Sequence, residues 1–223
     1  MKFTFYTFIF CFSLWSCNNQ EKHGYHHDYS RDNESNVHMN ETPFEDLVKM
    51  FEDSARAEWQ KPDEIIDLLG DLDGKKIMDI GAGTGYFAFR MAAKGANVIA
   101  ADVDDRFIEY LDNRAIENIE TRLVPYDNSN LKPKEVDAVI IVDTYHHIEK
   151  RTDYFKTVLK GLKKDGRLMI VDFKKAETPY GPPVNHRISA DEVVEELKTA
   201  GFISFEIEED FLPYQYVIIA KGF

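Results

Sequence analysis

The sequence has almost no cysteine: Cys11 and Cys17 are the two in 223 residues, and both lie near the N-terminus. Cleavage before Cys17 leaves one thiol at the first residue, which excludes an internal disulfide framework and a cysteine nucleophile. Positive charge is also scarce, with 27 lysines and arginines against 40 acidic residues and a net charge of −13. Such an acidic chain is poorly suited to a nucleic-acid backbone, so we expect no nucleic-acid partner.

Long apolar runs are missing as well. Residues 3–15 are mostly apolar, but a membrane-spanning helix takes about 20 residues. Lys2 precedes this run, and Leu14-Trp15-Ser16-Cys17 resembles a bacterial lipobox. We therefore expect residues 1–16 to be a lipoprotein signal peptide and a lipidated Cys17 to attach the protein to a membrane of the cell envelope, on its periplasmic or surface side. Because Trp15 is atypical of a lipobox, an uncleaved anchor on the cytoplasmic face stays open.

Two further segments precede the main domain. Residues 17–41 are polar and show no apolar period, which predicts a flexible tether. Residues 42–70 are expected to form a helical extension. Thr42-Pro43-Phe44-Glu45 has the pattern of a capping box with a proline at the first helical position. Residues 71–223 then make one α/β domain of a size that buries a full core.

A glycine string marks the start of the main domain. A short apolar stretch leads into Asp79, after which Gly81, Gly83 and Gly85 alternate with other residues, and an apolar-periodic stretch follows. This is a strand, a tight turn and a helix, the entry to a nucleotide-type site in a parallel sheet. Glycine lets the backbone approach a ligand where a Cβ would collide. The G-x-G-x-G spacing differs from the dinucleotide spacing G-x-G-x-x-G.

The next predicted strand, over residues 97–102, ends in an acid. Asp102 comes 17 residues after Gly85, close to the spacing of a carboxylate that accepts hydrogen bonds from two ribose hydroxyls. The segment from Asp102 to Asp105 is also good N-cap chemistry for the following helix. Both roles stay open for Asp102 at this point.

The alternation of strands and helices continues to the end of the chain. Asp165-Gly166 is expected to be a turn, and Ser189 with Glu192 forms a capping box for a helix that Gly201 ends. Further strands are predicted over residues 119–124, 136–142, 167–173, 202–207 and 215–220. The pattern predicts a Rossmann-like α/β fold, with a seven-stranded, mostly parallel sheet and helices on both faces.

Together, the acid, the glycine string and the order of elements resemble the class I S-adenosylmethionine (SAM)-dependent methyltransferases, over roughly residues 75–220. The resemblance implies SAM as cofactor, an antiparallel last strand, and a lid in residues 42–70 for which Trp59 and Gln60 are candidates. In the family, Asp102 corresponds to the ribose-binding acid and Asp127 to the residue that contacts adenine. The implied cofactor-binding residues are Asp79, Gly81, Ala82, Gly83, Gly85, Asp102, Val103, Asp127 and Asp143.

The acceptor side is predicted from the segment after the fourth strand. Tyr145, His146 and His147 are candidates for a general base, which methyl transfer needs only if the acceptor loses a proton. Packing or hydrogen bonding is the alternative role for the two histidines. A metal is not expected, since histidine spacing matches no standard zinc pattern.

These observations favour SAM-dependent methyl transfer to a small-molecule or lipid-like acceptor by in-line displacement. One alternative is a non-catalytic, membrane-anchored module that binds a nucleoside or a partner on the same fold. Another is an NAD-dependent oxidoreductase, which the glycine spacing and the lack of room for a second catalytic domain disfavour.

Overall fold

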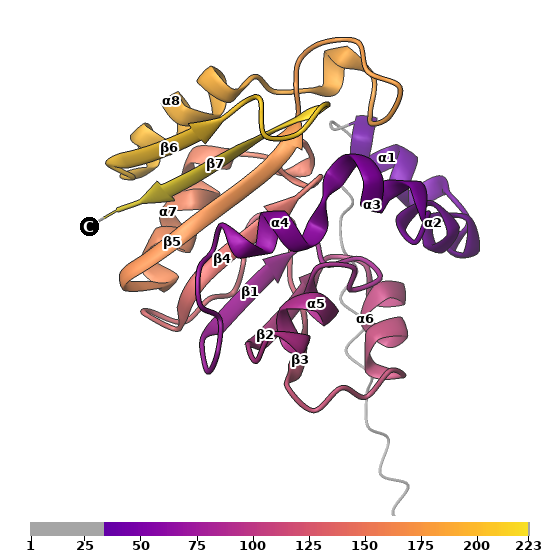
Figure 1. Ribbon diagram of the computed structural model, residues 1–223, viewed down its shortest axis with the longest axis horizontal. Helices are drawn as coiled ribbons and strands as arrows, with labels where there is room; N and C mark the ends of the chain where they lie inside the picture. The colour runs from indigo at the N-terminus through magenta and orange to yellow at the C-terminus, as the bar shows by residue number, and fades with distance from the viewer. Residues whose placement is uncertain (1–33, 223) are drawn as a thin grey trace, which may run out of the picture.

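The computed structural model describes residues 34–222, which are built around one sheet (Figure 1). The strand order is β3-β2-β1-β4-β5-β7-β6. Strands β1 to β5 pair in parallel, whereas β7 runs antiparallel to both β5 and β6. This confirms the predicted fold class and its antiparallel last strand. The strands are β1 (Lys76–Ile80), β2 (Asn97–Asp102), β3 (Ile119–Leu123), β4 (Val136–Val142), β5 (Leu162–Phe173), β6 (Ser204–Glu208) and β7 (Gln215–Lys221).

Both faces of the sheet are buried at its central strands, because alternate side chains of these strands enter two separate cores. In β1, for example, Ile77 packs into one core and Met78 into the other. The helices that supply apolar residues to the Ile77 core are α4 (Pro62–Asp67), α5 (Ala88–Ala93) and α6 (Asp105–Asp112). The Met78 core is covered by α7 (Arg151–Gly161) and α8 (Ala190–Ala200) (Figure 1).

Helix α8 begins and ends as the sequence predicts. The Ser189 side chain accepts a hydrogen bond from the Glu192 backbone, and the Glu192 side chain accepts one from the Ser189 backbone. Gly201 follows the helix with a φ of 108°, in the left-handed region that glycine tolerates. The turn expected at residues 165–166 lies inside β5 as an irregularity of the strand, where the pairing with β4 shifts from Val136–Leu162 to Ala138–Arg167.

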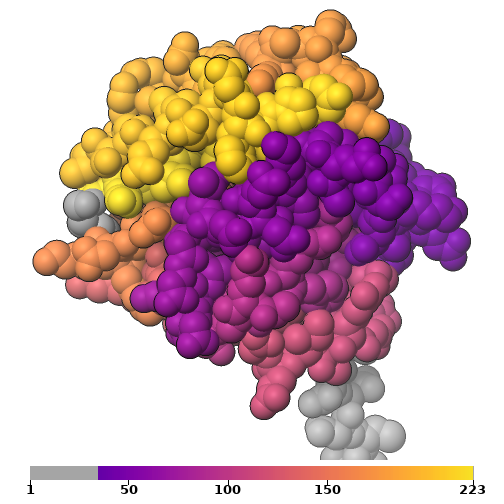
Figure 2. Space-filling view, in the orientation of Figure 1, coloured from indigo at the N-terminus to yellow at the C-terminus, as the bar shows by residue number. Residues whose placement is uncertain are grey.

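Three N-terminal helices lie across the carboxyl edge of the sheet: α1 (Glu34–Glu41), α2 (Phe44–Phe51) and α3 (Ala55–Gln60) (Figures 1 and 2). Two short 3-10 turns belong to the same edge, η1 (Tyr145–His147) after β4 and η2 (Val184–His186) before α8. The helical extension is therefore present. Among the described residues, no helix is long and apolar enough to cross a membrane.

Helix α1 corrects the expected tether over residues 34–41. Its buried residues are polar, Ser35 and Asn36, and they hydrogen bond with histidines of the domain. A helix held by polar contacts has no apolar period, so the hydrophobic pattern cannot reveal it. Residues 17–33 lie outside the described part of the chain. The capping box at Thr42 is also wrong, because its hydroxyl donates to the His38 carbonyl.

Candidate active site

The glycine loop joins β1 to α5 at the carboxyl edge of the sheet. Gly81, Gly83 and Gly85 have φ values of 75°, 53° and 86°, all in the left-handed region. A Cβ at Gly81 would lie 2.3 Å from the Thr144 hydroxyl oxygen, and one at Gly83 would lie 3.0 Å from the Phe51 ring. The backbone therefore bends sharply here, with no space for side chains toward β4 and α2.

Two buried carboxylates face this loop. Asp102 ends β2, and its carboxylate accepts hydrogen bonds from the backbone N–H groups of Gly83, at 2.9 Å, and Asp104, at 3.0 Å. Asp104, not Asp102, caps α6, which settles the alternative left open by the sequence. Burial raises the pKa of Asp79 to about 7, with the Asp102 charge adding to it, and burial raises that of Asp102 to about 6. The ionised forms of both acids would therefore be stabilised by a ligand that bears a positive charge or hydroxyl donors.

The surroundings of the loop fit a polar ligand. The hydroxyls of Thr84 and Tyr86 are buried and have no hydrogen-bond partner among the described residues. Ala82 is buried beside them, and Val103 is partly buried after β2. Asp127 is exposed after β3, on the far side of Asp102 from the loop in the sheet order. Acidic side chains therefore lie at the ends of β1 and β2 and after β3, at the carboxyl edge where ligands of parallel sheets bind.

Asp143 lies after β4 and is joined to the N-terminal helices. Its carboxylate accepts hydrogen bonds from Arg56 Nη2 at 3.0 Å and from Gln60 Nε2 at 2.9 Å. Gln215 of β7 donates to the other oxygen, and Gln60 also donates to Gln215. Burial raises the pKa of Asp143, although the Arg56 charge opposes this. The sequence pattern indicated Asp143 and Gln60 but not Arg56 or Gln215, since neither lies in a recognisable motif.

Trp59 of α3 belongs to an aromatic cluster beside this contact. Its ring stacks on Tyr180 with centroids 5.2 Å apart, and it packs against Phe173 and Tyr214 at 5.7 Å and 6.1 Å. Tyr180 lies in the loop between β5 and α8. Arg187 holds this loop by donating to four of its backbone carbonyls and to the Thr178 hydroxyl. Helix α3 and the loop thus meet in one aromatic cluster at this edge of the sheet.

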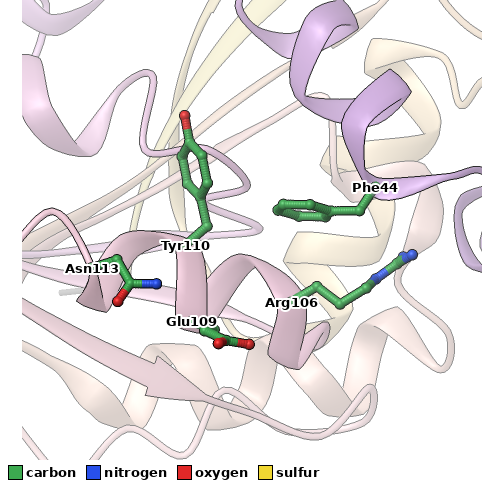
Figure 3. A pocket seen from close by; sticks show the side chains of 5 residues that line it. All are labelled: Phe44, Arg106, Glu109, Tyr110 and Asn113. Atoms are coloured by element: carbon green, nitrogen blue, oxygen red, sulfur yellow. The ribbon is translucent and has the colours of Figure 1, made fainter.

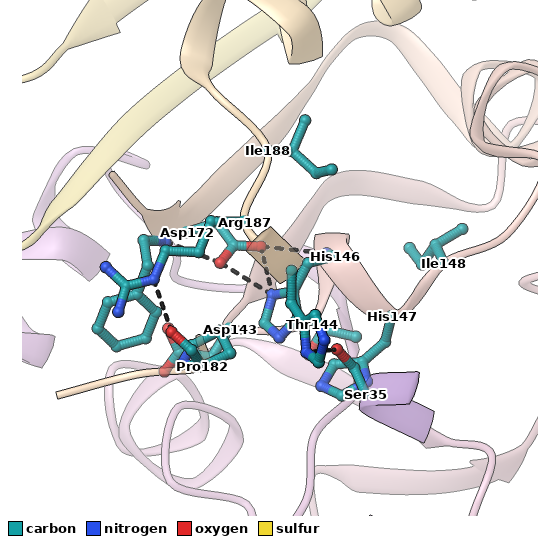
Figure 4. Close-up of polar contacts among 12 residues, drawn as sticks. Ser35, Asp143, Thr144, His146, His147, Ile148, Asp172, Pro182, Arg187 and Ile188 are labelled. Carbon is teal, nitrogen blue, oxygen red and sulfur yellow. Dashed lines mark hydrogen bonds and ion pairs between the residues drawn. The ribbon is translucent and has the colours of Figure 1, made fainter. Parts of the chain in front are cut away.

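His146 pairs with a buried carboxylate on the neighbouring strand (Figure 4). Its Nδ1 lies 3.0 Å from both oxygens of Asp172, and its backbone N–H also donates to Asp172. Burial lowers the pKa of His146, but the charge and hydrogen bond of Asp172 outweigh burial and raise that pKa above its ordinary value. Asp172 also accepts from the Phe173 backbone, so the carboxylate is firmly oriented.

His147 has a different environment, although its ring lies only 4.3 Å from that of His146. Asn36 of α1 binds its Nδ1 at 3.0 Å and donates to its backbone carbonyl at 3.1 Å. A second contact of α1 joins Ser35 to His186 Nδ1 at 3.2 Å. Burial, together with the charges of neighbouring histidines, lowers the pKa of His147 to about 3. His147 is therefore neutral and serves as an attachment point for α1.

Tyr145 does not face the site, which corrects the expectation that it is catalytic. Its side chain is fully buried in the Met78 core, where its ring stacks on Phe155. Its hydroxyl donates to Glu196 of α8. Within η1, successive side chains point in different directions, so Tyr145 faces the helices while the histidines stay at the sheet edge.

A separate hollow of about 370 Å³ lies between α2 and α6 (Figure 3). None of the acids of the sheet edge lines it, so its chemistry does not match that of the site. Within residues 34–222, no group of three or more histidine, cysteine or acidic side chains is arranged to hold a metal ion. The residues around the hollow are Phe44, Arg106, Glu109, Tyr110 and Asn113.

Comparison with known proteins concerns the fold and the segment that contains the glycine loop. Residues 78–170, from β1 to β5, match a family described as a methyltransferase domain. The whole fold is similar to a SAM-dependent methyltransferase from Aquifex aeolicus, with a TM-score of 0.75, 22% identity, and coverage of 82% of this chain and all of that one. The matched segment and the fold agree with the resemblance that the glycine string indicates, and the sheet has the class I methyltransferase fold of that solved structure.

Two curated relatives each match about half of the chain. A demethylmenaquinone methyltransferase of Tropheryma whipplei is 30% identical over 108 residues, which are 48% of this chain and 45% of that protein. A phosphoethanolamine N-methyltransferase of Arabidopsis thaliana is 27% identical over 121 residues, 52% of this chain and 25% of that protein. The chain thus spans about half the length, or less, of these relatives.

Proposed function

We propose that the protein transfers the methyl group of SAM to a small-molecule or lipid-like acceptor by in-line displacement. The observation that carries the proposal is the glycine loop with Asp102: three left-handed glycines turn the backbone at β1, and the Asp102 carboxylate is hydrogen bonded to that loop at Gly83. This is a pre-formed nucleoside cradle of the methyltransferase type.

Each acid at the edge has a proposed part in binding. Asp102 accepts hydrogen bonds from the ribose hydroxyls, and Asp127 accepts one from the adenine amino group. Asp79 and Asp143, which burial leaves poorly solvated, favour the positive charge of the cofactor. Gly81, Ala82, Gly83, Gly85 and Val103 supply the backbone surface against which the nucleoside lies.

The chemistry asks little of the protein beyond positioning. SAM supplies an activated methyl group, so the side chains orient the acceptor and exclude water. If the acceptor loses a proton, His146 is the residue placed to take it. Its Nδ1 is held by Asp172, and this contact fixes the ring. His147 is assigned to holding α1 rather than to catalysis.

The relatives support a small acceptor. The two curated enzymes are named for demethylmenaquinone and phosphoethanolamine. In this chain the acceptor side is bordered by Trp59, Phe173, Tyr180 and Tyr214, which favours an acceptor with an apolar or aromatic portion.

Calorimetric titration with SAM, S-adenosylhomocysteine and NAD tests the proposal. We expect the first two ligands to bind and NAD not to bind. Asp102→Ala should weaken SAM by about 1–3 kcal/mol, the scale for hydrogen bonds to a charged group. Asp127→Ala should cost less, because it removes one bond. Binding of NAD alone would favour the oxidoreductase, and SAM affinity unchanged in Asp102→Ala would remove Asp102 from the site.

A non-catalytic nucleoside-binding module is the second candidate, and the buried His146–Asp172 pair counts against it. A module that only binds has no need of an oriented imidazole on the acceptor side. Transfer of radiolabelled methyl from SAM to a small-molecule extract distinguishes the two candidates, since the module binds SAM without turnover.

We also propose that a lipid on Cys17 attaches the protein to a membrane of the cell envelope. The lipobox-like Leu14-Trp15-Ser16-Cys17 supports this, and it lies outside the described residues. Mass spectrometry of the mature protein is expected to show an acylated N-terminal cysteine that is absent in Cys17→Ser. An unlipidated N-terminus at Met1 would contradict it.

A further inference from the structure

One arginine of helix α3, Arg56, contacts the acidic edge of the sheet. Arg56 reaches from α3 to Asp143, and its side chain is 12% exposed. The guanidinium carbon also lies 4.5 Å from the centroid of the Tyr86 ring, in the glycine loop. Arg187, also near this edge, donates to four backbone carbonyls of its own loop and to the Thr178 hydroxyl. Arg56 therefore places a guanidinium between Asp143 and the glycine loop, beside the proposed cofactor site.

The sheet order indicates which part of the cofactor Arg56 meets. The proposed adenine contact, Asp127, follows β3, and the proposed ribose contact, Asp102, ends β2. Because β1 and β4 come next in the sheet, the methionine portion extends toward them. Arg56 lies there, between the loop after β1 and Asp143 after β4.

The methionine portion carries a carboxylate and an ammonium group. A carboxylate between Asp79 and Asp143 is repelled unless a cation accompanies it. Arg56 acts on both acids, since its charge counters the effect of burial on the pKa of each. An ammonium group is suited to Asp143, because a poorly solvated carboxylate is stabilised by each positive group that contacts it.

Arg56 has hydrogen-bonding capacity left for such an anion. It donates from Nε to Gln60 at 2.5 Å, from Nη1 to the Phe51 carbonyl at 3.1 Å, and from Nη2 to Asp143 at 3.0 Å. Within the described part of the chain, these contacts use three of its five N–H donors. One N–H on each terminal nitrogen remains, and such a pair suits the two oxygens of a carboxylate.

We propose that Arg56 binds the α-carboxylate of the cofactor's methionine portion while Asp143 binds its α-ammonium, so that helix α3 is part of the cofactor site. This rests on the proposed function, because it presupposes that the glycine loop binds SAM. It makes cofactor binding and closure of the lid one event, since α3 supplies the carboxylate ligand.

Comparing two ligands separates this role from simple attachment of the lid. S-adenosylhomocysteine and 5′-methylthioadenosine are both thioethers with the same nucleoside, but the second lacks the amino and carboxyl groups. By calorimetry, Arg56→Gln is expected to weaken S-adenosylhomocysteine about 10- to 100-fold, the range for a lost charge-assisted hydrogen bond. The affinity for methylthioadenosine should change by less than about twofold.

Arg90→Gln is the matched control. Its guanidinium also lies on the Tyr86 ring, at 3.9 Å, but it donates to the Tyr86 carbonyl from α5. It should leave the ratio of the two affinities unchanged. Arg56→Lys, which keeps the charge without the planar fork, should lose part of the S-adenosylhomocysteine affinity and none for methylthioadenosine.

Two results would overturn the proposal: an equal loss for both ligands in Arg56→Gln, which means that Arg56 only attaches the lid, or no loss for either. If Arg56→Gln does not fold, the same ratio in Arg56→Lys decides. A wild-type protein that binds neither ligand would contradict the proposed function rather than the role of Arg56.

Discussion

The two halves of the site are built from contacts of different range. The cofactor half, at the ends of β1 and β2, is joined by a hydrogen bond between Gly83 and Asp102, only 19 residues apart. The other half, which the N-terminal helices complete and which includes the acceptor side, depends on Arg56 with Asp143, 87 residues apart, and on Asn36 with His147, 111 residues apart. The residues of the first half lie in one local sequence motif. The contacts of the other half form only when distant segments of the chain pack together.

The same contrast holds for the two parts of the N-terminal extension. Helix α2 is amphipathic and packs aromatic residues, with Phe51 stacked 5.4 Å from Phe107 of α6. Helix α1 is held through the polar residues Ser35 and Asn36. Apolar packing stabilises a contact without directional demands, while polar contacts depend on the charge state of their partners. Attachment of α1 is therefore the more sensitive to pH.

The largest expected effect is a loss of SAM binding when the glycine loop of the cofactor half is altered. Gly83→Val adds a side chain at a φ of 53°, with its Cβ 3.0 Å from the Phe51 ring. We expect SAM binding to fall below detection by calorimetry, because the side chain occupies the cradle. Gly74→Val is the control, since Gly74 has a φ of 65° but no atom within 4 Å of the added Cβ, and it should keep SAM affinity. Full affinity in a folded Gly83→Val protein would contradict the assignment of the glycine loop.

Sequence reasoning predicts the strand, the glycine turn and their place in the fold where one segment carries the whole signal. The strand, the glycines and Asp102 lie within 30 residues, so their spacing alone indicates the cradle. It failed for Arg56 and α1, whose partners come from other parts of the chain. It also failed for Tyr145. A short turn such as η1 has no hydrophobic periodicity, so its sequence does not show which side chain enters the core.

The next effect concerns the acceptor half. Asp172→Asn removes the charge that raises the pKa of His146. If His146 is the base, its neutral form is active, so wild-type turnover should rise with pH through a midpoint above 6.5, its ordinary value. In Asp172→Asn the midpoint should move to lower pH and kcat should fall. His146→Gln should lower kcat by about 10²–10⁴-fold with SAM affinity unchanged. The pH dependence of kcat, measured with an accepted small molecule, checks this.

Full turnover in His146→Gln would show that His146 only packs against Asp172. In that case the loss should appear as a lower melting temperature, which thermal denaturation of the same variant measures. His147→Gln provides the comparison, since His147 contacts α1 and is expected to keep turnover in its folded fraction.

A smaller effect concerns the pH dependence of stability, in which His147 is expected to differ from His146. Burial and the neighbouring histidines lower the pKa of His147 to about 3, against about 6.5 in an unfolded chain. As pH falls below 6.5, the unfolded state therefore binds a proton that the folded state does not, and stability is lost down to about pH 3. His147→Gln should remove this contribution. Thermal melts at pH 7 and pH 5 should show a smaller decrease in the variant than in the wild type, and an equal decrease would contradict the neutral, buried state of His147.

The smallest effect tests the correction at Tyr145. Tyr145→Phe removes the hydroxyl that donates to Glu196, but Glu196 keeps both of its hydrogen bonds from Arg151. The ring still stacks on Phe155. Because no buried group is left unpaired, the loss of unfolding free energy should be about 1 kcal/mol, the ordinary scale of one hydrogen bond. Denaturant unfolding measures this loss, and calorimetry should find SAM affinity unchanged. A large decrease in turnover with normal stability would instead return Tyr145 to the acceptor side, where the sequence alone had placed it.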